Sequence, residues 1–365
     1  MKNSFIIAEA GVNHNGSLDL ARQLVDAAVE AGADAIKFQT FKAENLVTKS
    51  AQQAEYQIRN MGNSSSQYEM LKKLELSYAD FKKLKQYCDN KGIVFLSTPF
   101  DFESVDFLIQ EMQLKTIKIP SGEITNAPYL HKIGSYGVKV ILSTGMATKE
   151  EIHLALAFLA YGFAKKSDVS FDKVKRFYQT KEANMLLKEK VSLLHCTTEY
   201  PPPYEEVNLN AMDDLKEEFH LPIGLSDHTE GIVVPIAAVA KGAEIIEKHF
   251  TLDKTLPGPD HRASLEPEEL KDMIQSIRIV EKALGKKSKT PTERELKNKA
   301  VTRKSLVAAK SIKKGERFTL DNLTVKRPGS GIEPYYFWDL IGTPADKDYE
   351  EDEVINQCVP NRLLF

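Results

Sequence analysis

The most constraining feature of this sequence is the alternation of short β-rich runs with helical segments through residues 1–285. Parallel strands need crossover connections of a dozen or more residues, which the helical segments supply. Eight such units in this length predict a (β/α)8 TIM barrel. The eight strand-like runs lie at residues 5–9, 35–39, 93–98, 116–119, 139–143, 191–196, 222–226 and 244–250.

An open, doubly wound sheet is the structural alternative, and it would usually carry a glycine-rich phosphate turn after its first strand. Residues 11–16 read Gly-Val-Asn-His-Asn-Gly and do not fit the G-x-G-x-x-G pattern of that turn. Ser17 is the predicted N-cap of the first helix, which Gly32 ends. We interpret the charged segment 165–190 as an additional helical excursion, and residues 50–68 as a polar insertion.

The composition changes after Gly285, where a lysine-rich polar segment begins. Residues 286–303 are predicted to be a linker, and residues 304–365 to form a small β-rich domain with many turns. A domain of this size buries a limited core and is marginal by itself. The aromatic cluster at residues 335–338 is predicted to form that core.

Charge and composition narrow the class of protein. Lysine and arginine total 49 against 52 aspartates and glutamates, so the formal net charge is −3. This balance excludes a protein that binds nucleic acid through bulk positive charge. There is no apolar run of the ~20 residues needed to span a bilayer, and no secretory signal pattern, so we expect a cytoplasmic protein without membrane attachment.

The cysteines offer little functional information. Cys88, Cys196 and Cys358 are far apart and odd in number, which predicts neither a disulfide framework nor a zinc knuckle. Cys196 lies within an apolar run and is interpreted as a small core residue rather than a nucleophile.

Polar residues end the predicted strands, at the edge where the active sites of such barrels form. A buried lysine or glutamate is costly unless it is paired, so packing alone does not explain charge or histidine at five of the eight ends. The polar residues at the strand ends are Glu9, Lys37, Gln39, Thr98, Lys118, Ser121, Glu123, Ser143, Thr144, Thr197, Thr198, Ser226, Asp227, His228, Glu247 and His249.

Lys37 and Lys118 are the candidate anion-binding residues. Lysine charge, strand-end hydroxyl groups, and backbone N–H groups near Gly122 and Gly145 would together hold a phosphate or a carboxylate. The hydroxyl groups belong to Thr98, Ser121, Ser143 and Ser226. The structural alternative is that the lysines form salt bridges with neighbouring glutamates. Four carboxylates, at Glu9, Glu123, Glu247 and Asp260, are candidates for acid–base chemistry or for binding hydroxyl groups.

His228 and His249 end the neighbouring seventh and eighth strands. One histidine at a strand end is more often a structural hydrogen-bonding group, but two on adjacent strands suit a divalent ion that keeps open positions for water and substrate. There is no third obvious histidine, which disfavours a zinc hydrolase. Strand parity places Glu247 and His249 on one face and turns Lys248 toward the helices, where its long stem would extend to solvent.

Ten motifs, in one order along nearly the whole chain, resemble those of the sialic acid synthase family of bacteria. They include Lys-Ile-Pro-Ser-Gly-Glu at 118–123 and Gly-Leu-Ser-Asp-His-Thr at 224–229. The motifs lie at residues 7–16, 37–40, 97–100, 118–123, 142–146, 195–201, 224–229, 247–251, 257–261 and 326–331.

The resemblance implies a TIM barrel followed by an antifreeze-like (SAF) domain, and a transferase of carbohydrate biosynthesis. Such an N-acetylneuraminate synthase condenses phosphoenolpyruvate with N-acetylmannosamine, giving N-acetylneuraminic acid and phosphate. The resemblance also implies a manganese or magnesium ion held by His228 and His249. It further implies a homodimer whose antifreeze-like domain is swapped onto the partner barrel, where Arg327 reaches the N-acetyl group of the sugar.

The resemblance assigns the remaining site residues to the two substrates. Those that match phosphoenolpyruvate contacts are Lys37, Thr98, Lys118, Ser121, Ser143 and Ser226. Those that match sugar contacts are Glu9, Gln39, Tyr200, Glu247 and Asp260. Thr198 stands where many sialic acid synthases carry asparagine, and this departure leaves the exact sugar open.

The strand-end residues suit this chemistry. Lys37 and Lys118 would offset the carboxylate and phosphate charges while carbon 3 of phosphoenolpyruvate attacks the sugar aldehyde. Water then adds at carbon 2, and phosphate leaves by C–O cleavage. Glu123 is the hypothesised proton shuttle, and Glu9 orients sugar hydroxyl groups together with Gln39.

Two alternatives remain open from the sequence. The first is a legionaminic or pseudaminic acid synthase that uses a 2,4-diacetamido-6-deoxy hexose. The second is a non-catalytic sugar-binding or ice-binding protein that uses the small domain. The presence of both lysines and both histidines disfavours the second, because a binding protein need not keep a phosphate and metal site.

Overall fold

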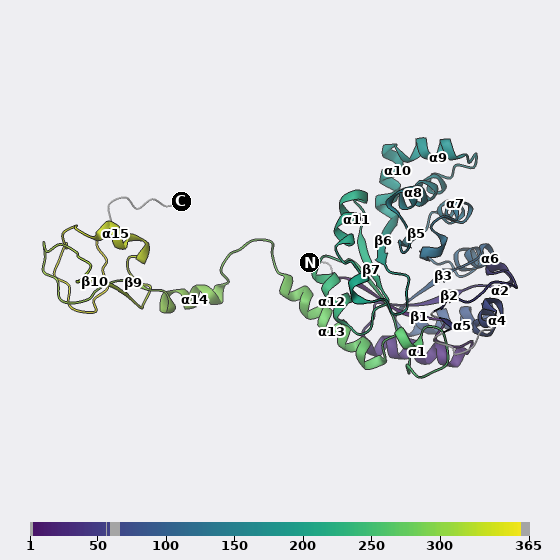
Figure 1. Cartoon of the computed structure of the whole chain (residues 1–365), viewed down its shortest axis with the longest axis horizontal. Helices are drawn as coiled ribbons and strands as arrows, with labels where there is room; N and C mark the ends of the chain where they lie inside the picture. Colours follow the sequence, from purple (N-terminus) through teal and green to yellow (C-terminus); the bar gives the residue numbers. More distant parts are fainter. Residues whose placement is uncertain (1–2, 56, 59–65, 359–365) are drawn as a thin grey trace. The chain divides into compact units, whose positions relative to one another are not determined.

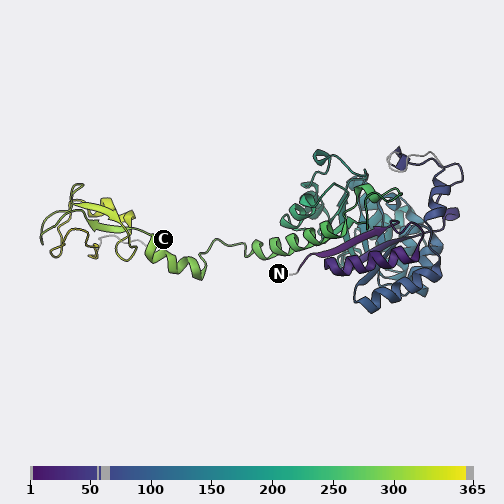
Figure 2. The same cartoon turned by 90° about the horizontal axis from the view of Figure 1, so that it is seen from below.

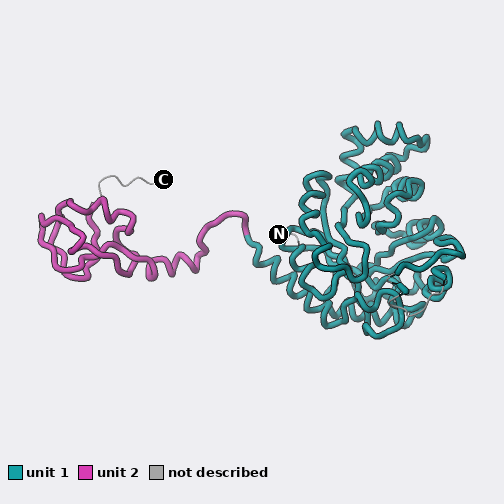
Figure 3. Tube along the Cα trace, in the orientation of Figure 1, with its two compact units in different colours: residues 1–285 teal, residues 286–365 magenta. Residues whose placement is uncertain are grey.

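The structure is a computed structural model that describes residues 3–55, 57–58 and 66–358 (Figures 1 and 2). The chain divides into two compact units, Met1–Gly285 and Lys286–Phe365 (Figure 3). In the described part of the chain, none of the helices combines the length and the apolar character needed to cross a membrane.

Unit 1 is built on one sheet of eight strands in the order β3-β2-β1-β8-β7-β6-β5-β4. The paired strands run parallel, and the two ends of this order, β3 and β4, contact each other and bring the sheet to a near-closed barrel. The predicted (β/α)8 barrel is therefore confirmed. The strands are β1 (Phe5–Gly11), β2 (Ala35–Thr40), β3 (Val94–Pro99), β4 (Thr116–Ile119), β5 (Lys139–Ser143), β6 (Val191–Cys196), β7 (Ile223–Asp227) and β8 (Ile245–His249).

Helices connect the strands, and the long helices such as α1, α5 and α13 lie on the outside of the barrel (Figures 1 and 2). The longer ones are α1 (Leu18–Ala31), α4 (Gln67–Leu74), α5 (Tyr78–Lys91), α7 (Ala127–Tyr136), α8 (Lys149–Phe163), α9 (Phe171–Tyr178), α10 (Lys181–Lys190), α11 (Ala211–Phe219), α12 (Val233–Ala240) and α13 (Pro267–Leu284). The shorter ones are α2 (Ala43–Leu46), α6 (Phe102–Asp106), η1 (Phe107–Glu111), η2 (Ser121–Glu123), η3 (Tyr204–Glu206) and η4 (His261–Ala263).

Local sequence explains several of these boundaries. The Ser17 hydroxyl accepts a hydrogen bond from the Leu20 N–H, and Gly32 ends α1 in the left-handed conformation, so both predicted caps are confirmed. Helices α9 and α10 form the predicted helical excursion and pack against α8. Part of the predicted polar insertion, residues 56 and 59–65, lies outside the described residues.

Strand parity builds the inside of the barrel in layers. Six buried apolar residues form one inner cluster: Ile7, Ala35, Leu96, Ile141, Leu194 and Ile245. The residues two positions further along the same strands are, in the same order, Glu9, Lys37, Thr98, Ser143, Cys196 and Glu247. Because side chains two apart in a strand share a face, these polar residues form the next inner layer, at the carboxyl ends of the strands.

Lys248 does not reach solvent, so this part of the sequence interpretation is wrong. Its side chain is fully buried, and its ammonium group lies 2.6 Å from Oδ2 of Asp227 and also donates to the Thr229 carbonyl. The outer face of β8 is covered, so the lysine stem has no path to water. The charge is compensated instead by a carboxylate on the neighbouring strand β7.

Unit 2 contains the two-stranded antiparallel sheet β9 (Ser305–Ala308) and β10 (Leu323–Lys326). It also contains α14 (Glu293–Thr302), which occupies part of the segment expected to be a linker, and the short helices η5 (Pro334–Tyr336) and α15 (Phe337–Leu340). Its buried core is Leu306, Ala308, Ile312, Phe318, Leu323, Ile332, Leu340, Ala345, Tyr349 and Ile355.

The aromatic cluster at residues 335–338 is not the core of unit 2, contrary to the sequence prediction. Tyr335 is 81% exposed and Trp338 is 76% exposed, while Tyr336 and Phe337 are partly buried against the core. The cluster spans a short 3-10 turn and a single helical turn, in which neighbouring side chains point in different directions. Leu340, at the end of α15, is the residue of this segment that enters the core.

Candidate active site

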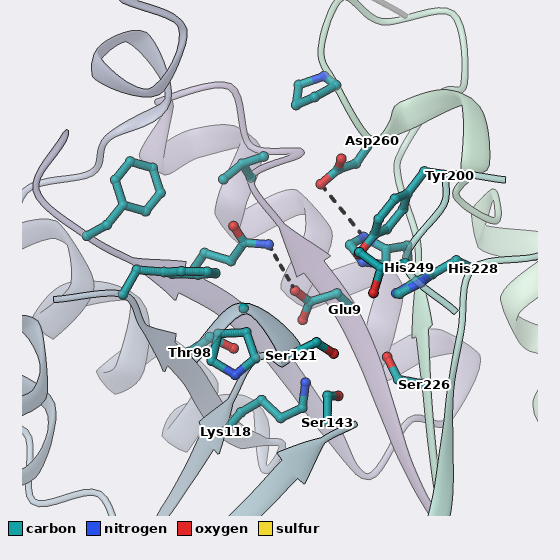
Figure 4. Close-up of a pocket in the computed structure, with 18 of the residues that line it drawn as sticks. Glu9, Thr98, Lys118, Ser121, Ser143, Tyr200, Ser226, His228, His249 and Asp260 are labelled. Carbon is teal, nitrogen blue, oxygen red and sulfur yellow. Dashed lines mark hydrogen bonds and ion pairs between the residues drawn. The ribbon is translucent and has the colours of Figure 1, made fainter. Parts of the chain in front are cut away.

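A cavity of about 320 Å³ lies at the carboxyl ends of the barrel strands (Figure 4). Nearly all residues that the sequence marked as site residues line it. They are Glu9, Lys37, Gln39, Thr98, Lys118, Ser121, Ser143, Thr198, Tyr200, Ser226, His228, Glu247, His249 and Asp260. The strands of the barrel therefore bring together side chains that are up to about 250 residues apart in the chain.

Two of the predicted site residues are not in this lining. Glu123 ends η2, and its carboxylate accepts a hydrogen bond of 2.6 Å from Nδ2 of Asn126 at the start of α7. Arg327 is an exposed residue of unit 2 that follows β10. The roles predicted for these two residues stay predictions.

A buried network of lysines and glutamates fills the floor of the cavity. Nζ of Lys37 lies 2.7 Å from Oε2 of Glu9 and 3.6 Å from Oε2 of Glu247. Nζ of Lys118 lies 3.1 Å from Oε1 of Glu247. The Ser226 hydroxyl also donates to Glu247, at 2.8 Å. The salt bridges that the sequence left as a structural alternative therefore form, and they hold both ammonium groups inside the cavity.

The network sets the protonation of its members. Desolvation opposes the charge of Lys37, but attraction to Glu247 and Glu9 outweighs it and raises the lysine pKa above its usual value. Burial raises the pKa of Glu9 to about 7, and Lys37 opposes this shift. At Glu247, burial is outweighed by Lys118 and Lys37, which lower its pKa. Glu9 is therefore the carboxylate of the pair that can exchange a proton near neutral pH.

The rings of His228 and His249 lie next to each other on one side of the cavity, with centroids 5.4 Å apart (Figure 4). Nδ1 of His228 lies 2.7 Å from the Thr197 carbonyl, which leaves Nε2 with its lone pair. Nδ1 of His249 is buried and has no hydrogen-bond partner among the described residues, although Oδ2 of Asp260 lies 4.0 Å away. The ring of Tyr200 packs on His228, with centroids 4.1 Å apart.

Both imidazoles are held in the neutral form that binds metal ions. Burial lowers the pKa of His228 to about 4. Burial, followed by repulsion from His228, lowers the pKa of His249 well below its usual value. Among residues 3–55, 57–58 and 66–358, no group of three or more His, Cys, Asp or Glu side chains is arranged to hold a metal ion. Two neutral imidazoles therefore fit an ion that takes its other ligands from water or substrate.

Gly145 is required where β5 leaves the barrel. A Cβ atom there would lie 2.4 Å from Oγ1 of Thr198, 2.8 Å from Sγ of Cys196 and 2.8 Å from Oγ of Ser121. The Gly145 N–H donates to Ser121 at 2.9 Å, so it supports a site residue in place of the direct anion contact that the sequence suggested. Cys196 is buried as predicted, but it also lines the cavity.

We expect Gly145→Ala to lower kcat/KM about 100-fold, because an added methyl group would push Ser121 and Thr198 out of position. Steady-state kinetics would measure this loss. Gly122→Ala is the matched control for folding, because a Cβ atom there meets nothing within 4 Å. We expect its Tm to stay within roughly 2 °C of the wild type. An active Gly145→Ala variant would show that the close packing has no functional role.

One side of the cavity was not recognised from the sequence. Apolar side chains from the segments that follow β1, β2 and β3, from α2 and from α4 also line it, including Val12, Phe41, Leu46, Met70 and Phe100. The spacing of Met70 and Leu74 indicates a buried helix face. This spacing does not show whether the buried face packs against other side chains or borders a cavity.

The chain is similar to known synthases of carbohydrate biosynthesis. The sequence profile of the NeuB family matches residues 24–289, and that of the SAF domain matches residues 303–357. The chain is 50% identical over 357 residues to N,N'-diacetyllegionaminic acid synthase of Campylobacter jejuni, covering 98% of this chain and all of that protein. It is 49% identical to the Legionella pneumophila protein of the same name, covering 93% and 89% of the two chains.

Solved structures agree with the fold. The chain is similar to the N-acetylneuraminic acid (sialic acid) synthetase of Leptospira borgpetersenii, with a TM-score of 0.66 and 35% identity. The similarity covers 81% of this chain and 90% of that one. The two relatives of about 50% identity are thus named N,N'-diacetyllegionaminic acid synthases, whereas the Leptospira protein, at 35% identity, is named a sialic acid synthetase.

Proposed function

The chain belongs to the NeuB family, and on that premise we propose that it condenses phosphoenolpyruvate with a 2,4-diacetamido-6-deoxy hexose to give N,N'-diacetyllegionaminic acid and phosphate. The observation that carries the proposal is the joint placement of Lys37, Lys118, His228 and His249 around one buried cavity. Two lysines suit the two anionic groups of phosphoenolpyruvate, and two neutral imidazoles suit a divalent ion.

The sugar that we propose differs from N-acetylmannosamine, which the family resemblance led us to expect. N-acetylmannosamine, the substrate expected from the resemblance, fits the family as a whole. The alternative is better supported, because relatives of about 50% identity are N,N'-diacetyllegionaminic acid synthases and the sialic acid synthetase is 35% identical. Thr198 lines the cavity, and its departure from the asparagine of many sialic acid synthases leaves the sugar open without choosing between the two.

Phosphoenolpyruvate is assigned to the floor of the cavity. Glu9 and Glu247 compensate the charges of Lys37 and Lys118. The hydroxyl groups of Ser143 and Thr198 are buried without a hydrogen-bond partner among the described residues. A buried hydroxyl group without a partner is unfavourable, so a bound phosphate or carboxylate that accepts from these groups would be stabilised.

His228 and His249 would hold a manganese or magnesium ion. When bound, such an ion supplies Lewis acidity that polarises the aldehyde oxygen of the sugar. Lys37 and Lys118 neutralise the anionic substrate, so carbon 3 can approach the aldehyde. Glu9 accepts or returns a proton near neutral pH, while Gln39, 3.4 Å from Glu9 through Nε2, orients the hydroxyl groups of the sugar. Water adds at carbon 2, and phosphate leaves by C–O cleavage.

The test is phosphate release when the purified protein is mixed with phosphoenolpyruvate, manganese and either sugar. We expect turnover with the diacetamido-deoxy sugar to exceed turnover with N-acetylmannosamine. Phosphoenolpyruvate labelled with ¹⁸O at the bridging position should release labelled phosphate. Unlabelled phosphate would reject C–O cleavage, and no phosphate with either sugar would reject the proposed function.

We expect His249→Ala to weaken Mn²⁺ binding at least about 10-fold and to abolish metal-dependent turnover, because one of two protein ligands is lost. Calorimetric titration of the substrate-free protein with Mn²⁺ separates binding from activity. His153→Ala is the control, since this histidine lies on the outer helix α8 and bonds to Tyr178 and Glu218. Unchanged Mn²⁺ affinity in His249→Ala would reject the ligand assignment.

We further infer from the family resemblance a homodimer in which unit 2 of one protomer supplies Arg327 to the other. Arg327 is exposed in the single chain. A residue that contacts a partner protomer has to be exposed in this way. Light scattering that finds a monomer at assay concentrations, with full activity, would reject the exchange. The expected cytoplasmic location is part of the same proposal, and fractionation of cells would test it.

A further inference from the structure

The cavity has two chemically different sides. The strand ends supply the charged network of Lys37, Glu9, Lys118 and Glu247. The other side is an apolar wall, which we define as Val12, Phe41, Leu46, Met70, Leu71 and Phe100. These six residues belong to one hydrophobic cluster and all line the cavity.

Contacts between its own segments hold the apolar wall together. The Ala43 N–H donates to Oε1 of Glu75 at 2.6 Å, which joins the start of α2 to the end of α4. Lys72 on α4 bridges Glu44 at 3.0 Å and Glu75 at 2.8 Å. The rings of Phe41 and Phe100 meet edge to face, with centroids 6.3 Å apart. Side chains of the protein itself therefore define the shape of the wall.

Its chemistry excludes the anionic substrate. A phosphate or carboxylate against aliphatic and aromatic side chains would lose its hydration without gaining hydrogen bonds. The lysines and hydroxyl groups that compensate such an anion lie at the strand ends. A substrate that contacts the wall is therefore the sugar, and the parts of a sugar that suit an apolar surface are its methyl groups.

We propose that the apolar wall selects the methyl groups of the acceptor sugar, with the deoxy carbon 6 against α2 and α4. This inference rests on the proposed function, and it makes the apolar wall the part of the site that determines which sugar is accepted. A sugar with a hydroxyl group at carbon 6 would place that group against Leu46 and Leu71 without a hydrogen-bond partner. Gln67, at the start of α4, also lines the cavity, and its amide matches the donor and acceptor of an acetamido group.

The apolar character of the wall sets the expected size of the preference for the 6-deoxy sugar. An apolar pocket discriminates against an added hydroxyl group by about 100-fold, far less than a hydrogen-bonding site discriminates against its loss. We therefore expect kcat/KM for the 6-deoxy sugar to exceed that for the same diacetamido sugar with a carbon 6 hydroxyl group by about 10- to 100-fold.

The decisive experiment combines two sugars with substitutions in the wall. Leu71→Gln and Leu46→Gln place an amide in the wall, and both positions are partly buried, so the fold tolerates a polar atom. We expect each to reduce the preference for the 6-deoxy sugar about 10-fold, with the KM for phosphoenolpyruvate unchanged. Lys73→Gln is the matched control, because it makes the same residue at an exposed position of the same helix.

The outcomes separate this inference from the proposed function. Turnover of neither sugar by the wild type would reject both. Turnover of both sugars with equal kcat/KM would overturn the inference and leave the function standing. A wild-type preference that is unchanged in Leu71→Gln and Leu46→Gln would also overturn it, and would assign the wall to packing of α4 alone. A preference reduced in both variants, and kept in Lys73→Gln, supports it.

Discussion

Replacing Lys37 with methionine is expected to lower kcat/KM about 1,000-fold, which is what the loss of a buried charged contact to substrate costs. The same change removes the partner that lies 2.7 Å from Glu9. Breaking a buried ion pair on one side costs up to about 3–5 kcal/mol, because Glu9 must then either stay charged without its partner or take up a proton. The variant should therefore be both inactive and less stable, and steady-state kinetics with thermal unfolding measure the two losses.

A second substitution separates the two losses. Glu9→Gln in the Lys37→Met background removes the uncompensated carboxylate, so we expect stability to recover in part and activity to stay absent. Lys149→Met is the surface control, because its ion pair with Asp214 at 3.0 Å is exposed and contributes at most about 1 kcal/mol. Recovery of activity in the double variant would show that Lys37 serves the fold alone and does not bind substrate.

The sequence was sufficient to predict the barrel because each of its elements has a local cause. A strand buried on both faces is an apolar run, and its polar last residues mark the end that opens to the cavity. Parity then places Glu9 two residues after Ile7 and Glu247 two residues after Ile245, so the inner face follows from spacing. Nearly all predicted site residues line the cavity for this reason.

The parts that could not be predicted depend on contacts between distant segments. The pairing of Lys37 with Glu9 and of Lys118 with Glu247 needs the closed barrel, since each lysine had several possible partners. Met70 and Phe41 have the pattern of ordinary core residues, and tertiary packing alone shows that they border a cavity. Trp338 is apolar in sequence yet 76% exposed, because local pattern does not show which face of a single turn meets the core.

Lys248 leads to a second large expected effect, on stability and on the histidine pair. It lies between Glu247 and His249 in β8, and its ammonium group holds Asp227 and Thr229, the residues on either side of His228. Asp227 in turn accepts from the Thr229 N–H at 3.2 Å and from its hydroxyl group at 3.0 Å. The ion pair behind the cavity thus fixes the two strand ends that carry the proposed metal ligands.

We expect Lys248→Met to lower the free energy of unfolding by about 3–5 kcal/mol, because Asp227 would remain as a buried, uncompensated carboxylate. Adding Asp227→Asn should restore part of that loss, since the amide can still accept from Thr229. Mn²⁺ affinity should also fall in the single variant, because His228 would lose the contacts that hold its strand end in place. The control is Lys254→Met, whose partly exposed pair with Glu269 contributes at most about 1 kcal/mol. Equal Tm values for Lys248→Met and Lys254→Met would contradict the structural role of the buried pair.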